Sequence, residues 1–146
     1  MTSREREMAD TLEEPVRSIA LAVFKYFDEV LLGSRWRVAF IGPLSCRRTA
    51  VEQNGLYQLG RSLPGKIVTK CDGYLKPSNH QPGWAFDIGI RDTWANEIVW
   101  YRDSSVMEPH QYFRQLVAFL IEAGMSWAGD WEDPWDWHHF EWKGTE

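Results

Sequence analysis

Residues 78–90 have the sequence SNHQPGWAFDIGI, and this stretch decides the fold. One face of its second half holds Trp84, Phe86, Ile88 and Ile90, and the other holds Ala85, Asp87 and Gly89. An alternation with a period of two residues predicts a β-strand with one apolar face buried. We expect the small and acidic face to point away from the main core, into a cleft.

A turn connects this strand to a histidine. Gln81-Pro82-Gly83 is a turn sequence that can fold the chain back, so that His80 and Asp87 face the same point. A covered, unpaired carboxylate costs several kcal/mol, and a metal ion is one of few groups that offset this cost. A structural Asp87 paired with an arginine explains the pattern equally well, so the residues leave both interpretations open.

The C-terminal stretch 127–142 has no clear period and contains five Trp, two His and five acidic residues. Within it, Asp136 precedes His139 by three residues, which in a turn places both side chains on one side of the chain. A hydrolytic zinc site needs a carboxylate beside the metal-bound water, to accept its proton. The alternative is an exposed acidic segment that packs its Trp rings on the core.

Histidines are scarce in this chain. A catalytic zinc usually takes three protein ligands and leaves a fourth position for water. Of the four histidines, His80, His138 and His139 lie in segments rich in turn residues and acids. His110 lies at the polar start of a predicted helix, and we expect it to be a solvated surface residue.

The remaining elements follow from periodicity and from turn residues. We expect a helix from Pro15 to Gly33, a short strand that ends before Gly42-Pro43, a helix from Thr49 to Gly60, and a helix from Pro109 to Gly124. Thr49 and Glu52 have the spacing of a capping box. Residues 70–78 are expected to form a loop.

Composition limits the class of protein. A chain of 146 residues, 44% of them hydrophobic, is long enough for one compact domain. The formal net charge of -5 offers no broad cationic field, so nucleic acid is not an expected partner. Nine Trp indicate either a Trp-built core or a surface that holds sugars or peptides with flat rings.

Residues 1–14 are charged and have no apolar segment typical of a signal peptide, so we expect the chain to begin in the cytosol. The longest apolar stretches are too short to cross a bilayer, and we expect a soluble protein without stable membrane insertion. Cys46 and Cys71 are expected to be free thiols.

Several motifs in one order identify a resemblance. They are Glu52–Arg61 followed by Pro64–Thr69, then Ser78-Asn79-His80 with Asp87, then Gly129-Asp130-Trp131 with Asp136 and His139-Phe140-Glu141. Over residues 44–142 the chain resembles the D-alanyl-D-alanine carboxypeptidases and L-alanyl-D-glutamate endopeptidases. The likeness is greatest to the small phage endolysins and bacterial autolysins of this family.

The resemblance implies a zinc ion held by His80, Asp87 and His139, with Asp136 as general base. It also implies that Arg48 holds the substrate or the developing oxyanion, with Ser78 and Arg47 as further substrate-binding residues. Arg48 is preferred over Arg47 because it keeps the family's distance to Glu52-Gln53.

The chain departs from the family at two positions. Cys46-Arg47-Arg48 stands where the family often has Gly-Tyr-Arg. His138 stands where a proline is frequent, so His138 could compete with His139 for the metal or act as a donor behind the ligands. His139 is preferred because it keeps the spacing from Asp136 and the His-Phe-Glu run.

The resemblance also implies the fold class, α+β, in which a small antiparallel sheet floors a hedgehog/D-Ala-D-Ala-peptidase-like zinc cleft and helices pack on the other face. We expect one zinc peptidase domain over residues 1–146. Its family-like core is residues 44–142, and residues 1–40 are a helical N-terminal extension. The protein is expected to be a monomer.

The implied function is that of a hydrolase, a bacteriolytic zinc metallopeptidase that cuts peptidoglycan stem peptides. The first choice is an L-Ala-D-Glu endopeptidase, as in phage endolysins. Alternatives are a D-Ala-D-Ala carboxypeptidase or dipeptidase, a non-catalytic wall-binding or virion module, and a hedgehog-like domain with a structural zinc. Without a signal peptide, the enzyme would reach the cell wall through a holin, through lysis of a neighbouring cell, or on a virion.

Overall fold

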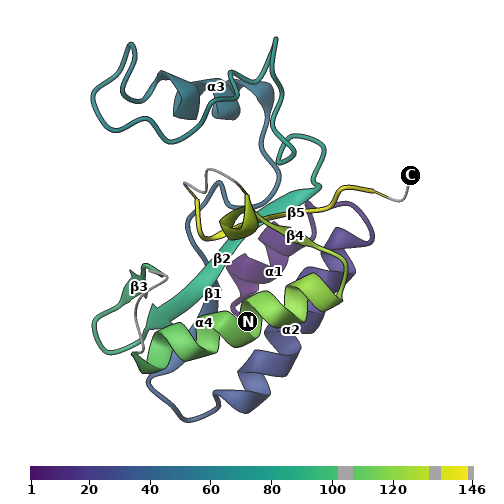
Figure 1. The fold of residues 1–146 in the computed structure, drawn as a ribbon, viewed down its shortest axis with the longest axis vertical. Coiled ribbons are helices and arrows are strands. Elements are labelled where there is room, and N and C mark those ends of the chain that lie inside the picture. The colour runs from purple at the N-terminus through teal and green to yellow at the C-terminus, as the bar shows by residue number, and fades with distance from the viewer. Residues whose placement is uncertain (102–106, 132–135, 145–146) are drawn as a thin grey trace.

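The computed structural model describes residues 1–101, 107–131 and 136–144, which form an α+β fold, as expected (Figure 1). The helices are α1 (Ser3–Ala9), α2 (Val16–Val30), α3 (Ala50–Gln58) and α4 (Glu108–Glu122), with a 3-10 turn η1 at Ala128–Asp130. The strands are β1 (Trp36–Phe40), β2 (Ala85–Asp92), β3 (Glu97–Val99), β4 (Ser126–Trp127) and β5 (His139–Glu141).

The strand β2 is the centre of an antiparallel sheet with the order β1-β2-β5-β4. One edge of β2 pairs with β1 along its length. The other edge is shared, because β5 pairs with residues 85–87 and β3 pairs with residues 90–92. The β2–β5 register puts Asp87 directly opposite His139.

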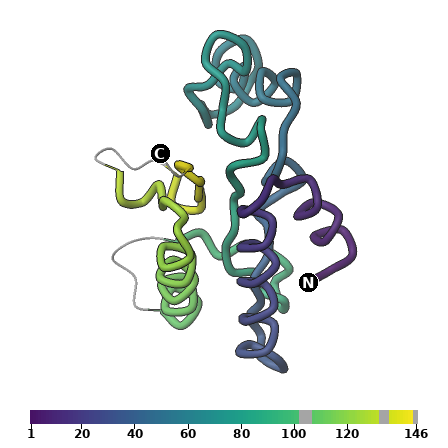
Figure 2. Tube along the Cα trace, turned by 90° about the vertical axis from the view of Figure 1, so that its right-hand side faces the viewer, coloured from purple at the N-terminus to yellow at the C-terminus, as the bar shows by residue number. Residues whose placement is uncertain are grey.

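The apolar face of β2 lies in the core. Phe86, Ile88 and Ile90 are buried there, as the alternation predicted, against the two long helices α2 and α4 (Figure 2). These helices contribute Phe24 and Phe27 from α2, and Phe113, Leu116 and Leu120 from α4. Each such side chain contributes about 1.5–3 kcal/mol when fully buried, so the core fixes β2 firmly under the site.

Trp84 is an exception to the predicted strand face. It is 46% exposed, because β2 begins at Ala85 and Trp84 lies in the turn before it. Its backbone N–H donates to the Asn79 carbonyl, and its own carbonyl accepts from Trp142. Trp84 therefore joins the turn to the C-terminal segment rather than filling the core.

The local sequence signals are confirmed. The helix α2 begins after Pro15 and ends before Gly33, whose φ is 77°. The helix α3 is N-capped by Thr49, whose hydroxyl accepts from Glu52 N–H while the Glu52 carboxylate accepts from Thr49 N–H.

Residues 1–40 pack into the same core as the remainder of the domain. Ala9 and Val16 are fully buried, and β1 pairs with β2 over its full length. The helix α1, which the pattern did not reveal, is N-capped by Thr2 in a capping box with Glu5. Glu5 also forms an ion pair with Arg37 of β1, which attaches α1 to the sheet.

The prediction for His110 is wrong. His110 lies in the first turn of α4 but is only 5% exposed, and its ring is 5.5 Å from the Tyr101 ring. The helix begins at Glu108 and turns this position toward the core, so the polar start of the helix did not imply exposure. Neither ring nitrogen has a hydrogen-bond partner within the described part of the chain.

Residues 49–78, which contain α3 and its flanking loops, stand apart from the sheet and the long helices (Figures 1 and 2). None of these residues belongs to the main hydrophobic core of the described structure. Hydrogen bonds hold the unit together instead. Gln53 is fully buried, and its amide donates to Thr69 Oγ1 and to the Cys71 carbonyl.

In the part of the chain that the structure describes, no helix combines the length and the apolar character needed to cross a bilayer.

Candidate metal centre

Three potential metal ligands meet where β2, β5 and the loop before β2 come together. His80 Nε2 lies 3.2 Å from Asp87 Oδ1 and 3.2 Å from His139 Nδ1. His139 Nδ1 lies 3.0 Å from Asp87 Oδ1. In a tetrahedral zinc site with bonds of about 2.0–2.2 Å, ligand atoms lie about 3.4 Å apart. The spacing of the three atoms therefore fits one zinc ion.

The tautomer of His80 suits a metal ligand. Its Nδ1 lies 2.8 Å from the Cys46 carbonyl, which can only accept, so Nδ1 carries the hydrogen. The lone pair of Nε2 then points at Asp87 and His139. Three acceptor atoms that converge in this way repel one another unless a proton or a cation lies between them. A hydrogen bond behind the ring is the usual way in which proteins orient such a ligand.

The turn before β2 is built to hold His80. Ser78 Oγ accepts from the His80 N–H, and Gln81 Oε1 accepts from the Ser78 N–H. Gly83 has a φ of 84°, and a Cβ at this position would lie 3.0 Å from the Glu13 backbone nitrogen. The positive φ and the close approach of the Glu13 backbone both favour glycine at this position. Ser78 thus shapes the turn through its hydroxyl.

His139 is flanked by two carboxylates. Nδ1 faces Asp87, and Nε2 lies 3.6 Å from Glu141 Oε2. Burial alone would lower the pKa of His139, but Asp87 and Glu141 raise it to about 10. Glu141 is in turn bonded by the Asn79 side-chain amide. The carboxylate–histidine arrangement fixes the ring with Nδ1 toward the site.

Asp87 uses its two oxygens differently. Oδ1 faces both histidines, and Oδ2 accepts a hydrogen bond of 3.0 Å from Arg48 Nη2. Burial would raise the pKa of Asp87, but the two histidines hold it well below its usual range. The arginine pairing expected of a structural Asp87 is present, and the carboxylate still presents one oxygen to the histidines, as a metal ligand would.

Arg48 connects the site to α3. Besides Asp87, it donates to Gln53 Oε1 at 3.0 Å and to the Leu44 carbonyl at 2.6 Å. Only 11% of its side chain is exposed. All three guanidinium nitrogens are engaged, so Arg48 orients Asp87 in this structure.

Asp136 lies in the turn that leads into His139, and its carboxylate is not one of the cluster of possible ligands. Its Oδ1 accepts from the His138 N–H at 3.1 Å. Burial raises the pKa of Asp136, the charge of Asp87 raises it further, and His139 and His80 lower it. The charges of all three cluster members therefore act on its carboxylate.

The structure places the His138 ring against Ile88 and Gly89 of β2, outside the cluster of ligand atoms. Nδ1 lies 3.1 Å from the Ile88 carbonyl, and Nε2 accepts from the Tyr101 N–H at 3.0 Å. A Cβ on Gly89 would lie 2.7 Å from this ring, so the glycine makes room for it. Burial lowers the pKa of His138 to about 4. His138 therefore does not compete for the metal, nor does it lie behind the ligands.

Arg47 turns away from the cluster. Its guanidinium contacts the Gln81 carbonyl, the Thr11 carbonyl and Glu13 Oε1, at 3.3–3.4 Å. The side chain is exposed and attaches the turn before α3 to the N-terminal segment.

Four contributors to the site were not assigned roles from the sequence. They are the Cys46 carbonyl, Gln53, Asn79 and Glu141. A backbone carbonyl leaves no mark in a sequence. Glu141 was visible only as the end of the His-Phe-Glu run, with no sign that it faces His139. Trp131 adds an aromatic wall, with its ring 5.8 Å from the His139 ring.

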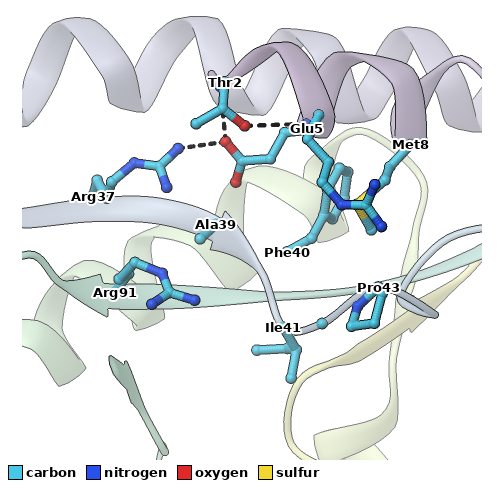
Figure 3. Close-up of a pocket in the computed structure, with 11 residues that line it drawn as sticks. Thr2, Glu5, Met8, Arg37, Ala39, Phe40, Ile41, Pro43 and Arg91 are labelled. Atoms are coloured by element: carbon cyan, nitrogen blue, oxygen red, sulfur yellow. Dashed lines mark hydrogen bonds and ion pairs between the residues drawn. The ribbon is translucent and has the colours of Figure 1, made fainter. Parts of the chain in front are cut away.

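A shallow pocket of about 260 Å³ lies elsewhere, between α1 and the end of β1 (Figure 3). Glu5 in its wall bonds to Arg37 and to Thr2, and Arg91 lies across from them. None of the three clustered ligands lines this pocket. The site is therefore identified by side-chain chemistry and not by a deep cavity.

Two comparisons bear on this geometry. A family model described as D-alanyl-D-alanine carboxypeptidase matches residues 73–142, a range that includes His80, Asp87, Asp136 and His139. The fold is similar to the crystal structure of the Serratia marcescens L-Ala D-Glu endopeptidase ChiX, with a TM-score of 0.56 and 17% sequence identity. That match covers 98% of this chain and 89% of the other. The family model confirms the family resemblance over residues 73–142, and the structural match shows a shared fold.

Proposed function

We propose that this chain, whose residues 73–142 match the D-alanyl-D-alanine carboxypeptidase family, is a zinc peptidase that cuts the stem peptides of peptidoglycan. The observation that carries the proposal is the cluster of His80 Nε2, Asp87 Oδ1 and His139 Nδ1, with Asp136 in the turn that leads into His139. Three ligands and a neighbouring carboxylate are the composition of a hydrolytic zinc site.

A zinc ion held by His80, Asp87 and His139 would polarise the scissile carbonyl and lower the pKa of a water molecule at the site. The protein's own contribution is to hold the donor atoms and to handle protons. The Cys46 carbonyl and Glu141 fix the two imidazoles, and Arg48 fixes the carboxylate.

Asp136 is the proposed general base. Its carboxylate accepts a proton from the attacking water and delivers it to the departing amine. A raised pKa suits this exchange, because a base works best when its pKa approaches the working pH. Burial and Asp87 both raise the pKa of Asp136. The His138 N–H holds Oδ1, and Oδ2 is the oxygen that we propose receives the proton of the water.

The preferred scissile bond is L-Ala-D-Glu, in an endopeptidase reaction. Support comes from the engagement of both candidate arginines, since Arg48 is bonded to Asp87 and Arg47 is directed at Glu13. An exopeptidase needs a cationic group for the free terminal carboxylate of its substrate. Arg48 supplies positive charge next to Asp87, and we propose that it also steadies the developing oxyanion.

The second candidate is a D-Ala-D-Ala carboxypeptidase, the activity for which the matched family is named. The two activities release different fragments. Digestion of purified muropeptides, followed by mass analysis, separates them. An endopeptidase leaves L-Ala on the glycan and frees the part of the stem peptide that begins with D-Glu, whereas a carboxypeptidase removes a single D-Ala.

The rival from another class is a wall-binding or virion module without catalysis. It predicts that muropeptides remain intact after long incubation with zinc-loaded, folded protein. The clustered ligand atoms favour the peptidase, because a binding module needs neither converging imidazoles nor a carboxylate among them. Unchanged muropeptide masses would decide for the rival.

A further inference from the structure

Residues 49–78, here called the cationic lobe, differ in charge from the remainder of the chain. The lobe contains Arg61, Lys66, Lys70 and Lys76, against the two acids Glu52 and Asp72. The formal net charge of the lobe is +2. The whole chain carries -5, so the residues outside the lobe carry -7. In Figures 1 and 2 the lobe is a separate projection above the sheet.

Both acids of the lobe are bonded to backbone amides. Glu52 Oε1 accepts from the Thr49 N–H at 2.9 Å. Asp72 Oδ1 accepts from the N–H groups of Tyr74 and Lys76, each at 2.9 Å. The side chains of Lys66 and Lys76 are exposed. The charge that the lobe offers to a partner is therefore mainly positive.

The lobe also exposes apolar side chains. Its exposed large hydrophobic residues are Val51, Leu63, Ile67, Val68, Tyr74 and Leu75. Leu75 is 95% exposed and Tyr74 62%, although both belong to a turn that is fixed by Asp72 and by a Gly73 N–H to Lys76 carbonyl bond. An ordered turn that displays apolar groups is typical of an interaction surface.

The lobe is attached directly to the metal centre. Gln53 joins it to Arg48, which holds Asp87. Gln81, in the turn after His80, donates to the Gly73 carbonyl and accepts from Ser78 N–H. The Tyr74 turn is therefore linked by hydrogen bonds to the turn that holds His80.

We propose that the cationic lobe is the docking surface for the anionic stem peptides of peptidoglycan, and this inference rests on the proposed function. The argument is charge complementarity. The D-glutamate of a stem peptide keeps a free carboxylate where it is not amidated, and the remainder of the chain, at -7, repels such a polymer. Lys66 and Lys76 attract the carboxylates, and Tyr74 and Leu75 contact the alkyl parts of the peptide.

The test compares two double variants in a full-length chain that also carries Asp136→Asn, so that the wall is not digested during the measurement. One variant is Lys66→Gln with Lys76→Gln. The control is Arg4→Gln with Lys25→Gln, which removes the same charge from exposed positions outside the lobe. Binding to purified sacculi, stripped of teichoic acids, is measured by co-sedimentation at low and high salt.

We expect the lobe variant to lose about tenfold in affinity at low salt and the control to lose much less. The difference should disappear near 1 M salt, where charges are screened within about 3 Å. Equal binding by the two variants, or no binding of the parent chain to sacculi, overturns the inference. Equal thermal melting curves establish that both variants are folded.

A second arm separates the lobe from catalysis. Two synthetic stem tripeptides, one with D-glutamate and one with its α-amide, compete with sacculi for the Asp136→Asn chain. The carboxylate form should compete better, and equal competition contradicts the inference. Hydrolysis by the unmodified chain is scored separately. Charge-dependent binding without hydrolysis would therefore refute the peptidase and leave the docking surface. Hydrolysis without charge-dependent binding would refute the docking surface and leave the peptidase.

Discussion

His139 on β5 lies directly opposite Asp87 on β2, and its Nδ1 is 3.0 Å from Asp87 Oδ1. This pairing makes the site a product of sheet register. A shift of β5 by one residue would put His138 in place of His139 and turn the ligand into the core.

Replacing each of the two adjacent histidines in turn is a direct check on that register. His139→Phe should abolish zinc binding and leave the protein folded, because His139 contacts the site. His138→Phe should leave zinc binding intact but lower the free energy of unfolding by at least about 2 kcal/mol, because the Ile88 carbonyl and the Tyr101 N–H lose their partner. Zinc titration and thermal melting of each variant measure the two effects. Zinc loss in the His138 variant alone would reverse the ligand assignment.

Asp136→Asn should separate metal binding from chemistry. The variant should bind zinc as tightly as the unmodified chain, since Asp136 is outside the cluster of ligand atoms. Its kcat on muropeptides should fall by about 10²–10⁴-fold, the usual contribution of a general base. Metal content and kcat are measured on the same preparation. Loss of zinc from the Asn variant would make Asp136 a ligand and disprove its assignment as base.

Glu141→Gln should weaken zinc binding by about 10–100-fold, the usual effect of removing the carboxylate behind a histidine ligand. The cause is the loss of the charged partner that faces His139 Nε2 at 3.6 Å. A competitive chelator titration gives the affinity. Glu97→Gln, at an exposed position on β3, is the matched control and should bind zinc normally. Equal zinc affinities of the two variants would show that Glu141 does not support His139 as a ligand.

Acid stability should depend on Asp92, far from the site along β2. Its two oxygens bind Arg35 at 2.8 and 2.6 Å, and this pairing lowers the pKa of Asp92 from 3.8 to about 2. The folded state thus binds the proton less readily than the unfolded state. The stabilisation is complete above about pH 4 and is lost as the pH falls toward 2.

Asp92→Asn should therefore destabilise the protein at neutral pH and flatten the pH dependence of unfolding between about pH 4 and 2. Denaturant unfolding of both chains across this range is the measurement. Parallel stability curves for the two chains would show that the Arg35–Asp92 pair does not act in this way.

Much of the fold was predictable because its signals are local. The Thr49–Glu52 capping box, the stop at Gly33 and the alternation from Phe86 to Ile90 each depend on neighbouring residues alone. The helix α1, capped by Thr2, obeyed the same rule but was hidden by its high charge. His110 was misplaced because its burial depends on how α4 packs, which the local sequence does not state.

The sequence allowed the meeting of the three proposed ligands to be predicted, but not the contacts that support them. The spacing of His80, Asp87, Asp136 and His139 matched a family motif, and the structure brings the three proposed ligands together. The Cys46 carbonyl and the Arg48–Asp87 bond are long-range contacts, separated along the chain by 34 and 39 residues. Only the folded chain reveals that Arg48 is already engaged with a proposed metal ligand.

The most direct test of the central claim is zinc content per chain, measured by mass spectrometry together with the release of new amino groups from purified peptidoglycan, with and without a chelator. The account predicts about one zinc per chain in the purified protein, none in His80→Ala, and release that stops with the chelator and returns with added zinc. A folded chain that holds no zinc and releases no amino groups would contradict the account.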